Sequence, residues 1–216
     1  MINFDSIDGA IFDVDGTILE SMGAWLKMER EYLVQLGMNM TPDLAGKFMV
    51  MSRQEISEYL RAEHGIDKPE QVIIDEQNAL MEDFYFNEAE LKPGVIPLLE
   101  GLRLRGIKMC VATATEKYLV DPTLERLNIA QYFGKTFTCG DEQTTKTKPD
   151  IYIRAAEFLG TDINRTIVFE DAFHAIKTAT AAGFIVAGVY DETAAIHKDD
   201  IKQLVDYYLE SLENIF

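Results

Sequence analysis

Acidic side chains stand at the ends of two apolar segments that lie far apart in the chain. Asp13 and Asp15 end an apolar run near the start, and Glu170 and Asp171 end another. Both runs have the composition of buried strands, and parallel strands bring their carboxyl ends to the same edge of a sheet. Four carboxylates in one small volume repel one another unless a cation neutralises them. Because oxygen ligands favour Mg²⁺ over zinc, we expect these four residues to form a magnesium site.

The same edge of the sheet should receive groups that suit phosphate. A third apolar run ends in Thr113 and Ala114, and Lys148 precedes a predicted helix. The Thr113 hydroxyl and the backbone amides after it can hold phosphoryl oxygens, and Lys148 can neutralise charge in the transition state. Asp13 is placed to attack phosphorus, and Asp15 to protonate the leaving oxygen and then activate water. We therefore expect phosphoryl transfer through an aspartyl-phosphate on Asp13.

Strands and helices that would position these residues alternate after Pro93. We expect strands at 107–112, around Phe137, at 166–169 and at 184–189, in addition to the first at 9–14. Helices are expected at 95–105, 117–127, 150–159, 172–182 and 201–212. This alternation predicts an α/β fold, with a Rossmann-like parallel sheet covered on both faces.

A different pattern occupies residues 20–90. Apolar residues recur there at helical spacing, and helices are expected at about 25–36, 52–64 and 69–86, without a convincing strand. This segment therefore reads as a helical insertion between the first strand and the rest of the sheet.

Composition narrows the class of protein. The chain has 216 residues and a formal net charge of −17, and we see no basic patch, so we expect neither nucleic acid nor a membrane surface as partner. No apolar run approaches the ~18 residues of a membrane helix, and the N-terminus lacks a signal-peptide pattern. Cys110 and Cys139 are too few for a disulfide framework and are expected to be buried free thiols. These features indicate a cytoplasmic protein.

The motifs together resemble those of the haloacid dehalogenase-like hydrolase superfamily. Four segments carry the resemblance: 12–17 with the nucleophile and acid/base, 111–115 with the phosphate-binding threonine, 148–152 with the lysine, and 168–171 with the metal acids. The resemblance implies that the metal is bound by the Asp13 side chain, the Asp15 backbone carbonyl and Asp171, with Glu170 close by.

The helical insertion resembles the small α-helical cap of the subgroup that contains β-phosphoglucomutase and phosphoglycolate phosphatase. The resemblance implies a core of residues 1–19 and 91–216 and a cap of residues 20–90, which closes over the site and selects the substrate. The segment 46–53 matches the family's substrate-facing loop, so Lys47 and Arg53 are candidates for contacting the leaving group.

Two further positions bear on the function. True β-phosphoglucomutases place a histidine where this sequence has Trp25, which favours a phosphatase over a mutase. His174 follows the fourth motif and is expected to face solvent.

We therefore expect a monomeric hydrolase that removes phosphate from a small phosphorylated metabolite, such as a sugar phosphate. One alternative is a β-phosphoglucomutase-type phosphomutase, in which the phosphoryl group on Asp13 returns to a second hydroxyl. Another is a non-catalytic protein that kept the fold and binds a ligand. The presence of both Asp13 and Asp15 argues against the last, since a pure binder has no need of both.

Overall fold

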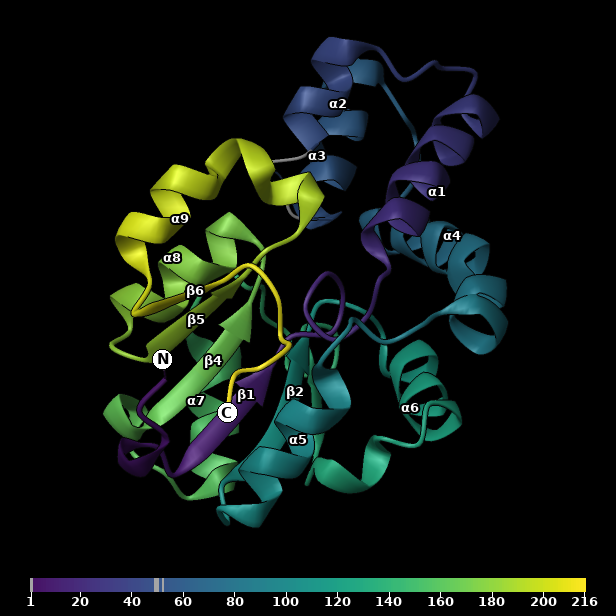
Figure 1. Ribbon diagram of the computed structural model, residues 1–216. Helices are drawn as coiled ribbons and strands as arrows, with labels where there is room; N and C mark the ends of the chain where they lie inside the picture. Colours follow the sequence, from purple (N-terminus) through teal and green to yellow (C-terminus); the bar gives the residue numbers. More distant parts are fainter. Residues whose placement is uncertain (1, 49–50, 52) are drawn as a thin grey trace.

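The computed structural model describes residues 2–48, 51 and 53–216. Within them, parallel strands form one sheet in the order β3-β2-β1-β4-β5-β6 (Figure 1). The strands are β1 (Gly9–Phe12), β2 (Lys108–Thr113), β3 (Thr136–Thr138), β4 (Thr166–Glu170), β5 (Ile185–Val189) and β6 (Tyr207–Leu209). The predicted α/β fold with a parallel sheet is confirmed.

Strand β1 lies in the middle of the sheet, where all four of its residues are buried. Its side chains alternate between the two faces, because successive residues of a strand point to opposite sides. Ala10 and Phe12 pack in the same apolar cluster as residues of α5 (Val95–Leu104) and α6 (Lys117–Arg126). Ile11 packs in a second cluster on the other side, with residues of α7 (Asp150–Leu159), α8 (Phe173–Ala181) and α9 (Lys198–Leu204). Burial on both faces explains why the strands read as continuous apolar runs.

The helical segment, which we define as residues 20–90, lies beyond the ends toward which the strand arrows point (Figure 1). It contains α1 (Met22–Gln35), α2 (Pro42–Phe48), α3 (Arg53–His64) and α4 (Glu70–Asp83). Helix α2 was not anticipated, because it is short and Gly46 in its interior weakens the helical pattern. Met49, Val50 and Ser52, in the predicted loop 46–53, lie outside the described residues.

Two other segments differ from the sequence expectation. The helix expected at 69–86 corresponds to α4, which ends at Asp83 and is followed by a π-helical turn at Phe84–Glu88. The predicted helix 201–212 is also wrong: α9 ends at Leu204, and Tyr207–Leu209 forms β6 beside β5. Aromatic residues fit a pleated edge well, and the open edge of β5 supplies backbone partners that outweigh helical spacing.

Among the described residues, no helix combines the length and the apolarity that crossing a membrane requires. Cys110 and Cys139 are buried free thiols, as expected.

Candidate active site

The pairing of β1 with β4 brings the acidic residues together. Phe12 pairs with Phe169, and their rings stack with centroids 4.5 Å apart. The Asp13 amide then donates to the Phe169 carbonyl over 3.0 Å, which places Asp13 next to the start of the following acidic pair. Carboxylate oxygens of Asp13, Glu170 and Asp171 lie within 4.8 Å of one another, and all three residues are buried. The structure thus gathers three of the four acids predicted for the metal site.

A tight turn after Asp13 folds the backbone around this cluster. Gly16 has a φ of +80°, and a Cβ atom there would collide with the carboxylate of Asp171. Glycine alone accepts this φ without strain and leaves room for the acid. Thr17, the next residue, donates from Oγ1 to Oδ1 of Asp171 over 3.2 Å. Gly16 therefore leaves the space beside the turn that the Asp171 carboxylate occupies.

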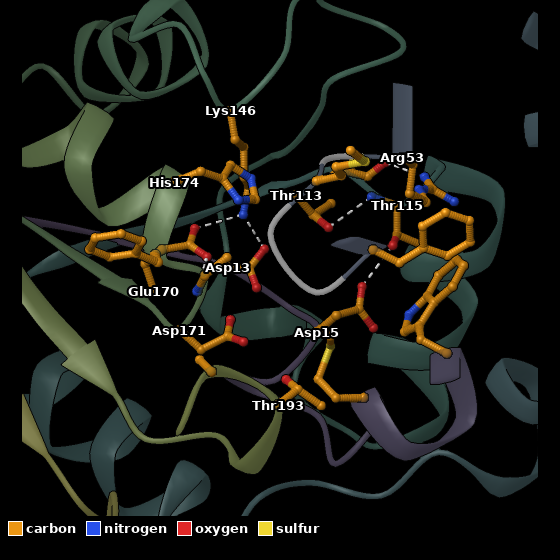
Figure 2. Close-up of a pocket in the computed structure, with 18 of the residues that line it drawn as sticks. Asp13, Asp15, Arg53, Thr113, Thr115, Lys146, Glu170, Asp171, His174 and Thr193 are labelled. Atoms are coloured by element: carbon orange, nitrogen blue, oxygen red, sulfur yellow. Dashed lines mark hydrogen bonds and ion pairs between the residues drawn. The ribbon is translucent and has the colours of Figure 1, made fainter. Parts of the chain in front are cut away.

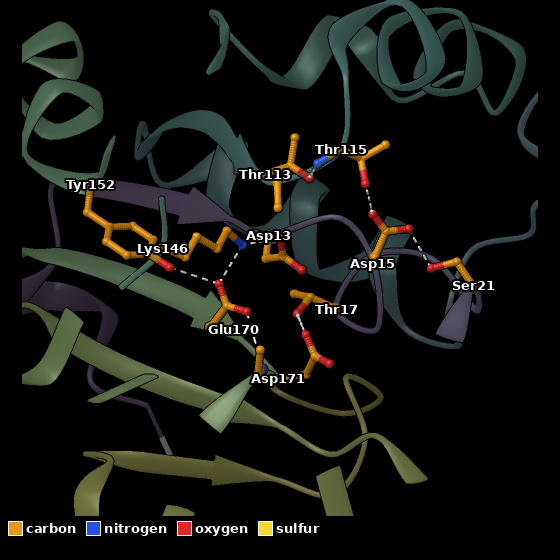
Figure 3. A network of polar contacts seen from close by, with 12 residues as sticks. Asp13, Asp15, Thr17, Ser21, Thr113, Thr115, Lys146, Tyr152, Glu170 and Asp171 are labelled. Carbon is orange, nitrogen blue, oxygen red and sulfur yellow. Dashed lines mark hydrogen bonds and ion pairs between the residues drawn. The ribbon is translucent and has the colours of Figure 1, made fainter. Parts of the chain in front are cut away.

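A buried lysine bridges two of the acids, as Figure 3 shows. The Lys146 ammonium donates to Oδ1 of Asp13 and, over 2.7 Å, to Oε2 of Glu170. The Tyr152 hydroxyl donates to the same Glu170 oxygen over 3.0 Å, and the Ala172 amide donates to its Oε1 over 3.2 Å. Glu170 is therefore engaged at both oxygens, and its contacts hold Lys146 against Asp13.

Lys148, the lysine that the sequence pattern placed at this site, is exposed. The Lys148 amide donates to the carbonyl of Thr145 over 3.1 Å, so the chain turns between the two lysines and sends their side chains in different directions. Lys146, two residues earlier in the chain, was not anticipated, because Lys148 stands beside Pro149 at the start of the predicted helix. The assignment changes to Lys146, whose side chain is 5% exposed.

Electrostatics leave this cluster short of positive charge. Burial and the charge of Glu170 raise the pKa of Asp13 to about 8. Burial and the charge of Asp13 hold the pKa of Asp171 well above its usual range. Burial opposes the charged form of Lys146, but Asp13 and Glu170 more than offset it and raise the pKa of this lysine. One ammonium among these acids leaves room for a cation, and a donor set made of oxygens suits Mg²⁺.

The side chain of Asp15 lies apart from this cluster and is held by hydroxyl groups. Ser21 Oγ donates to its Oδ1 and Thr115 Oγ1 to its Oδ2, each over 2.7 Å (Figure 3). The Tyr85 hydroxyl also donates to its Oδ1, over 2.5 Å. The carboxylate of Asp15 is therefore not grouped with the acids around Asp13, which leaves the predicted backbone contribution of Asp15 to the metal as a prediction. Sequence reasoning missed Tyr85, because an aromatic residue within helical spacing reads as core.

The predicted phosphate-binding segment follows β2. Thr113 is buried, and its Oγ1 accepts a hydrogen bond from the Thr115 amide over 3.0 Å. Thr113 and Ala114 both line a cavity of about 420 Å³ that also reaches Asp13 and Lys146 (Figure 2).

The two cap cations that were singled out behave differently. Arg53 lines the cavity and donates to Oδ1 of Asn78 over 2.6 Å and to the carbonyl of Ala114 over 2.5 Å. Its guanidinium lies 4.8 Å from the centroid of the Trp25 ring, within cation–π range. Lys47 lies outside the described lining and pairs with Asp43 over 3.0 Å. Of these two cations, Arg53 is therefore the one that lines the cavity.

His174, which was expected to face solvent, lines the cavity beside Lys146 (Figure 2). Burial lowers its pKa below the usual 6.5, so the imidazole is neutral at pH 7 and adds no charge to the site.

Comparisons with known proteins show the family to which the chain belongs. Residues 10–189 match the family model of the haloacid dehalogenase-like hydrolases. The phosphorylated carbohydrates phosphatase of Thermotoga maritima is 25% identical over 182 residues, which cover 82% of each chain. The phosphoglycolate phosphatase of Escherichia coli K12 is 27% identical over 230 residues, covering 93% of this chain and 90% of the relative.

A solved structure of similar fold is the family IA haloacid dehalogenase-type hydrolase from Entamoeba histolytica. It superposes with a TM-score of 0.85 at 20% identity, over 97% of this chain and 96% of that one. The family match spans the site from β1 to β5, and this chain belongs to the haloacid dehalogenase-like hydrolase family.

Proposed function

We propose that this protein is a magnesium-dependent phosphatase that hydrolyses a small phosphorylated metabolite through an aspartyl-phosphate on Asp13. The observation that carries the proposal is the buried contact of Asp13 with Lys146, inside a cluster of carboxylates that lacks compensating charge. A carboxylate so placed can serve as a nucleophile toward phosphorus once the charge around it is balanced.

The reaction has two displacements. An oxygen of Asp13 forms a bond to phosphorus while the bond to the leaving oxygen breaks, and Asp15 gives its proton to that oxygen. A water molecule then attacks the phosphorus of the aspartyl-phosphate and gives a proton to Asp15, while the bond between phosphorus and the Asp13 oxygen breaks. Inorganic phosphate leaves, and both aspartates return to their starting states.

Other residues of the site stabilise the transferring group. Lys146 would neutralise charge that spreads over the phosphoryl oxygens, and the Thr113 hydroxyl would hold one of them. The side chains of Asp13 and Asp171, with the carbonyl of Asp15, would hold Mg²⁺. The bound cation would supply the positive charge that lets a phosphate anion enter an acidic site.

We propose that the helical segment acts as the cap that selects the substrate. The cavity of about 420 Å³ between it and the strand ends has room for a small monoester. The relatives from T. maritima and E. coli are named for phosphorylated carbohydrates and for phosphoglycolate, which are small monoesters. Arg53 is the residue we assign to an anionic or hydroxylated leaving group.

A phosphomutase fits the site less well. The indole N–H of Trp25 donates to the Tyr85 hydroxyl over 3.1 Å. Because an indole nitrogen is only a donor and does not titrate near pH 7, Trp25 cannot take the part of the histidine found in mutases at this position.

The test is a panel of phosphorylated metabolites with Mg²⁺, assayed for free phosphate. We expect phosphate release from at least one small monoester and its loss in Asp13→Asn. Asp5 is an exposed aspartate outside the helical segment, so Asp5→Asn should keep the wild-type rate. Absence of turnover in the folded wild-type protein would contradict the phosphatase. Conversion of glucose 1-phosphate to glucose 6-phosphate would favour the mutase.

A further inference from the structure

Tyr85 is a buried residue at the junction between the helical segment and the sheet. Its side chain is fully buried, and its hydroxyl donates to Oδ1 of Asp15 over 2.5 Å. The same hydroxyl accepts from the indole N–H of Trp25 over 3.1 Å, and the two rings meet edge to face with centroids 6.2 Å apart. A continuous hydrogen-bonded chain therefore runs from Trp25 on α1 through Tyr85 to the proposed acid/base.

The backbone around Tyr85 explains how the side chain reaches Asp15. Tyr85 lies in the π-helical turn Phe84–Glu88, and such turns insert an extra residue that rotates the side chains after it. The carbonyl of Tyr85 accepts from Thr123 Oγ1 over 2.9 Å and from Arg126 Nη2 over 3.1 Å, both on α6. The turn is thus fixed to the core even though it belongs to the helical segment.

Asp15 meets donors from both sides of this junction. Ser21 stands at the beginning of α1 and Tyr85 at the far end of the helical segment, whereas Thr115 follows β2 in the core. Ser21 and Thr115 lie in segments next to the catalytic motifs. Tyr85 does not lie next to any of these motifs in the sequence, and the π-helical turn is what brings its hydroxyl to Asp15.

We propose that Tyr85, oriented by Trp25, is a positioning residue that sets the orientation of the Asp15 carboxyl group for proton transfer. The inference rests on the proposed function of Asp15 as acid/base. Tyr85 takes no part in bond making. It acts through Asp15, so its removal should slow the chemical step and leave substrate binding nearly unchanged.

The kinetic test compares Tyr85→Phe with the wild-type enzyme on a monoester that it hydrolyses. We expect kcat to fall about 10- to 100-fold, the loss that a hydrogen bond to a charged group carries, with KM within about twofold. In an Asp15→Asn background the same change should cost no further activity, because the group that Tyr85 orients is already altered. Tyr118→Phe, which removes an exposed hydroxyl bonded to Glu82, is the matched control and should behave as wild type.

Trp25→Phe provides a second variant, since it keeps the Tyr85 hydroxyl but removes the donor that orients it. It should lower kcat by less than Tyr85→Phe. Wild-type kcat in Tyr85→Phe, or an equal further loss in the Asp15→Asn background, would overturn the proposal.

A measurement without turnover separates this inference from the proposed function. Trp25 is the single tryptophan of the chain and its indole N–H donates to the Tyr85 hydroxyl, so its emission should respond to changes at that hydroxyl. Asp15→Asn should shift the emission in the presence of Tyr85 and leave it unchanged in Tyr85→Phe, and Tyr118→Phe should have no effect. If the wild type hydrolyses nothing but this coupling is observed, the function fails and the positioning contact stands. If Asp15→Asn shifts the emission equally in both backgrounds, or in neither, the positioning contact is refuted.

Discussion

Replacing Lys146 by methionine tests the central ion pair of the site. The change keeps the length and apolar stem of the side chain but leaves Asp13 and Glu170 buried without their ammonium partner. Breaking a buried pair by removing one member costs about 3–5 kcal/mol. Because the pKa of Asp13 is already raised to about 8 in the wild type, Asp13 largely carries a proton at pH 7 before the change, so we expect the loss to lie at the lower end, about 3 kcal/mol.

The assay has two parts. Denaturant unfolding should show the loss in EDTA and a smaller loss in Mg²⁺, because a bound cation supplies part of the missing charge. Phosphate release should fall on the order of 10²–10³-fold, as when one stabilising donor is removed from a transition state. Lys148→Met is the matched control and should change neither quantity, since that side chain is exposed. The reasoning is refuted if Lys148→Met abolishes activity while Lys146→Met retains it.

Further predictions concern the metal, a partly buried carboxyl group and a glycine. EDTA should abolish phosphate release, and Mg²⁺ should restore it and raise the melting temperature of the wild type but not of Asp171→Asn; full activity after chelation would exclude the magnesium step. Burial raises the pKa of Glu29 from 4.5 to about 7, so the unfolded chain loses this proton first and the free energy of unfolding decreases as pH rises through this interval, by at most about 3 kcal/mol. Glu29→Gln should remove that part of the pH dependence and the exposed control Glu31→Gln should not; superimposable pH curves for wild type and Glu29→Gln would contradict this. Gly16→Ala should lower activity at least tenfold through its collision with Asp171, whereas Gly37→Ala, which has a similar φ of +74° but open space around it, should cost only about 1–2 kcal/mol of stability; equal loss of activity in both would refute the role of the collision.

The sequence predicted the sheet well because buried parallel strands leave a strong local signature. The strand before Asp13 and the helix that begins at Asp150 could both be predicted, because each is encoded by the composition and spacing of residues close together in the chain. Strand β6 was missed because its pairing with β5 is a contact between distant segments, while Tyr207 and Tyr208 by themselves fit either structure.

In the site, too, the features that follow from local sequence could be predicted, and those that depend on tertiary contacts could not. Asp13, Glu170 and Asp171 could be placed together because strand ends share an edge of the sheet. Lys146 reaches Asp13 and Lys148 does not because the chain turns between them, and the hydrogen bond that forms this turn could not be predicted from the sequence. Tyr85 could not be foreseen, since a π-helical turn aims it at Asp15 where a regular helix would aim it elsewhere.

The central position of β1 has a consequence for how the chain folds during synthesis. This strand is made first, but its neighbours β2 and β4 follow only after the whole helical segment, and Gly9 pairs with Lys108 and Thr166. The helical segment can fold earlier through local contacts, whereas the sheet must wait for these long-range pairings. A ribosome-bound chain that stops before β4 therefore carries Asp13, the proposed nucleophile, beside an apolar strand with an open edge, which favours aggregation. The acidic cluster can thus form only late, when Glu170 and Asp171 have left the ribosome.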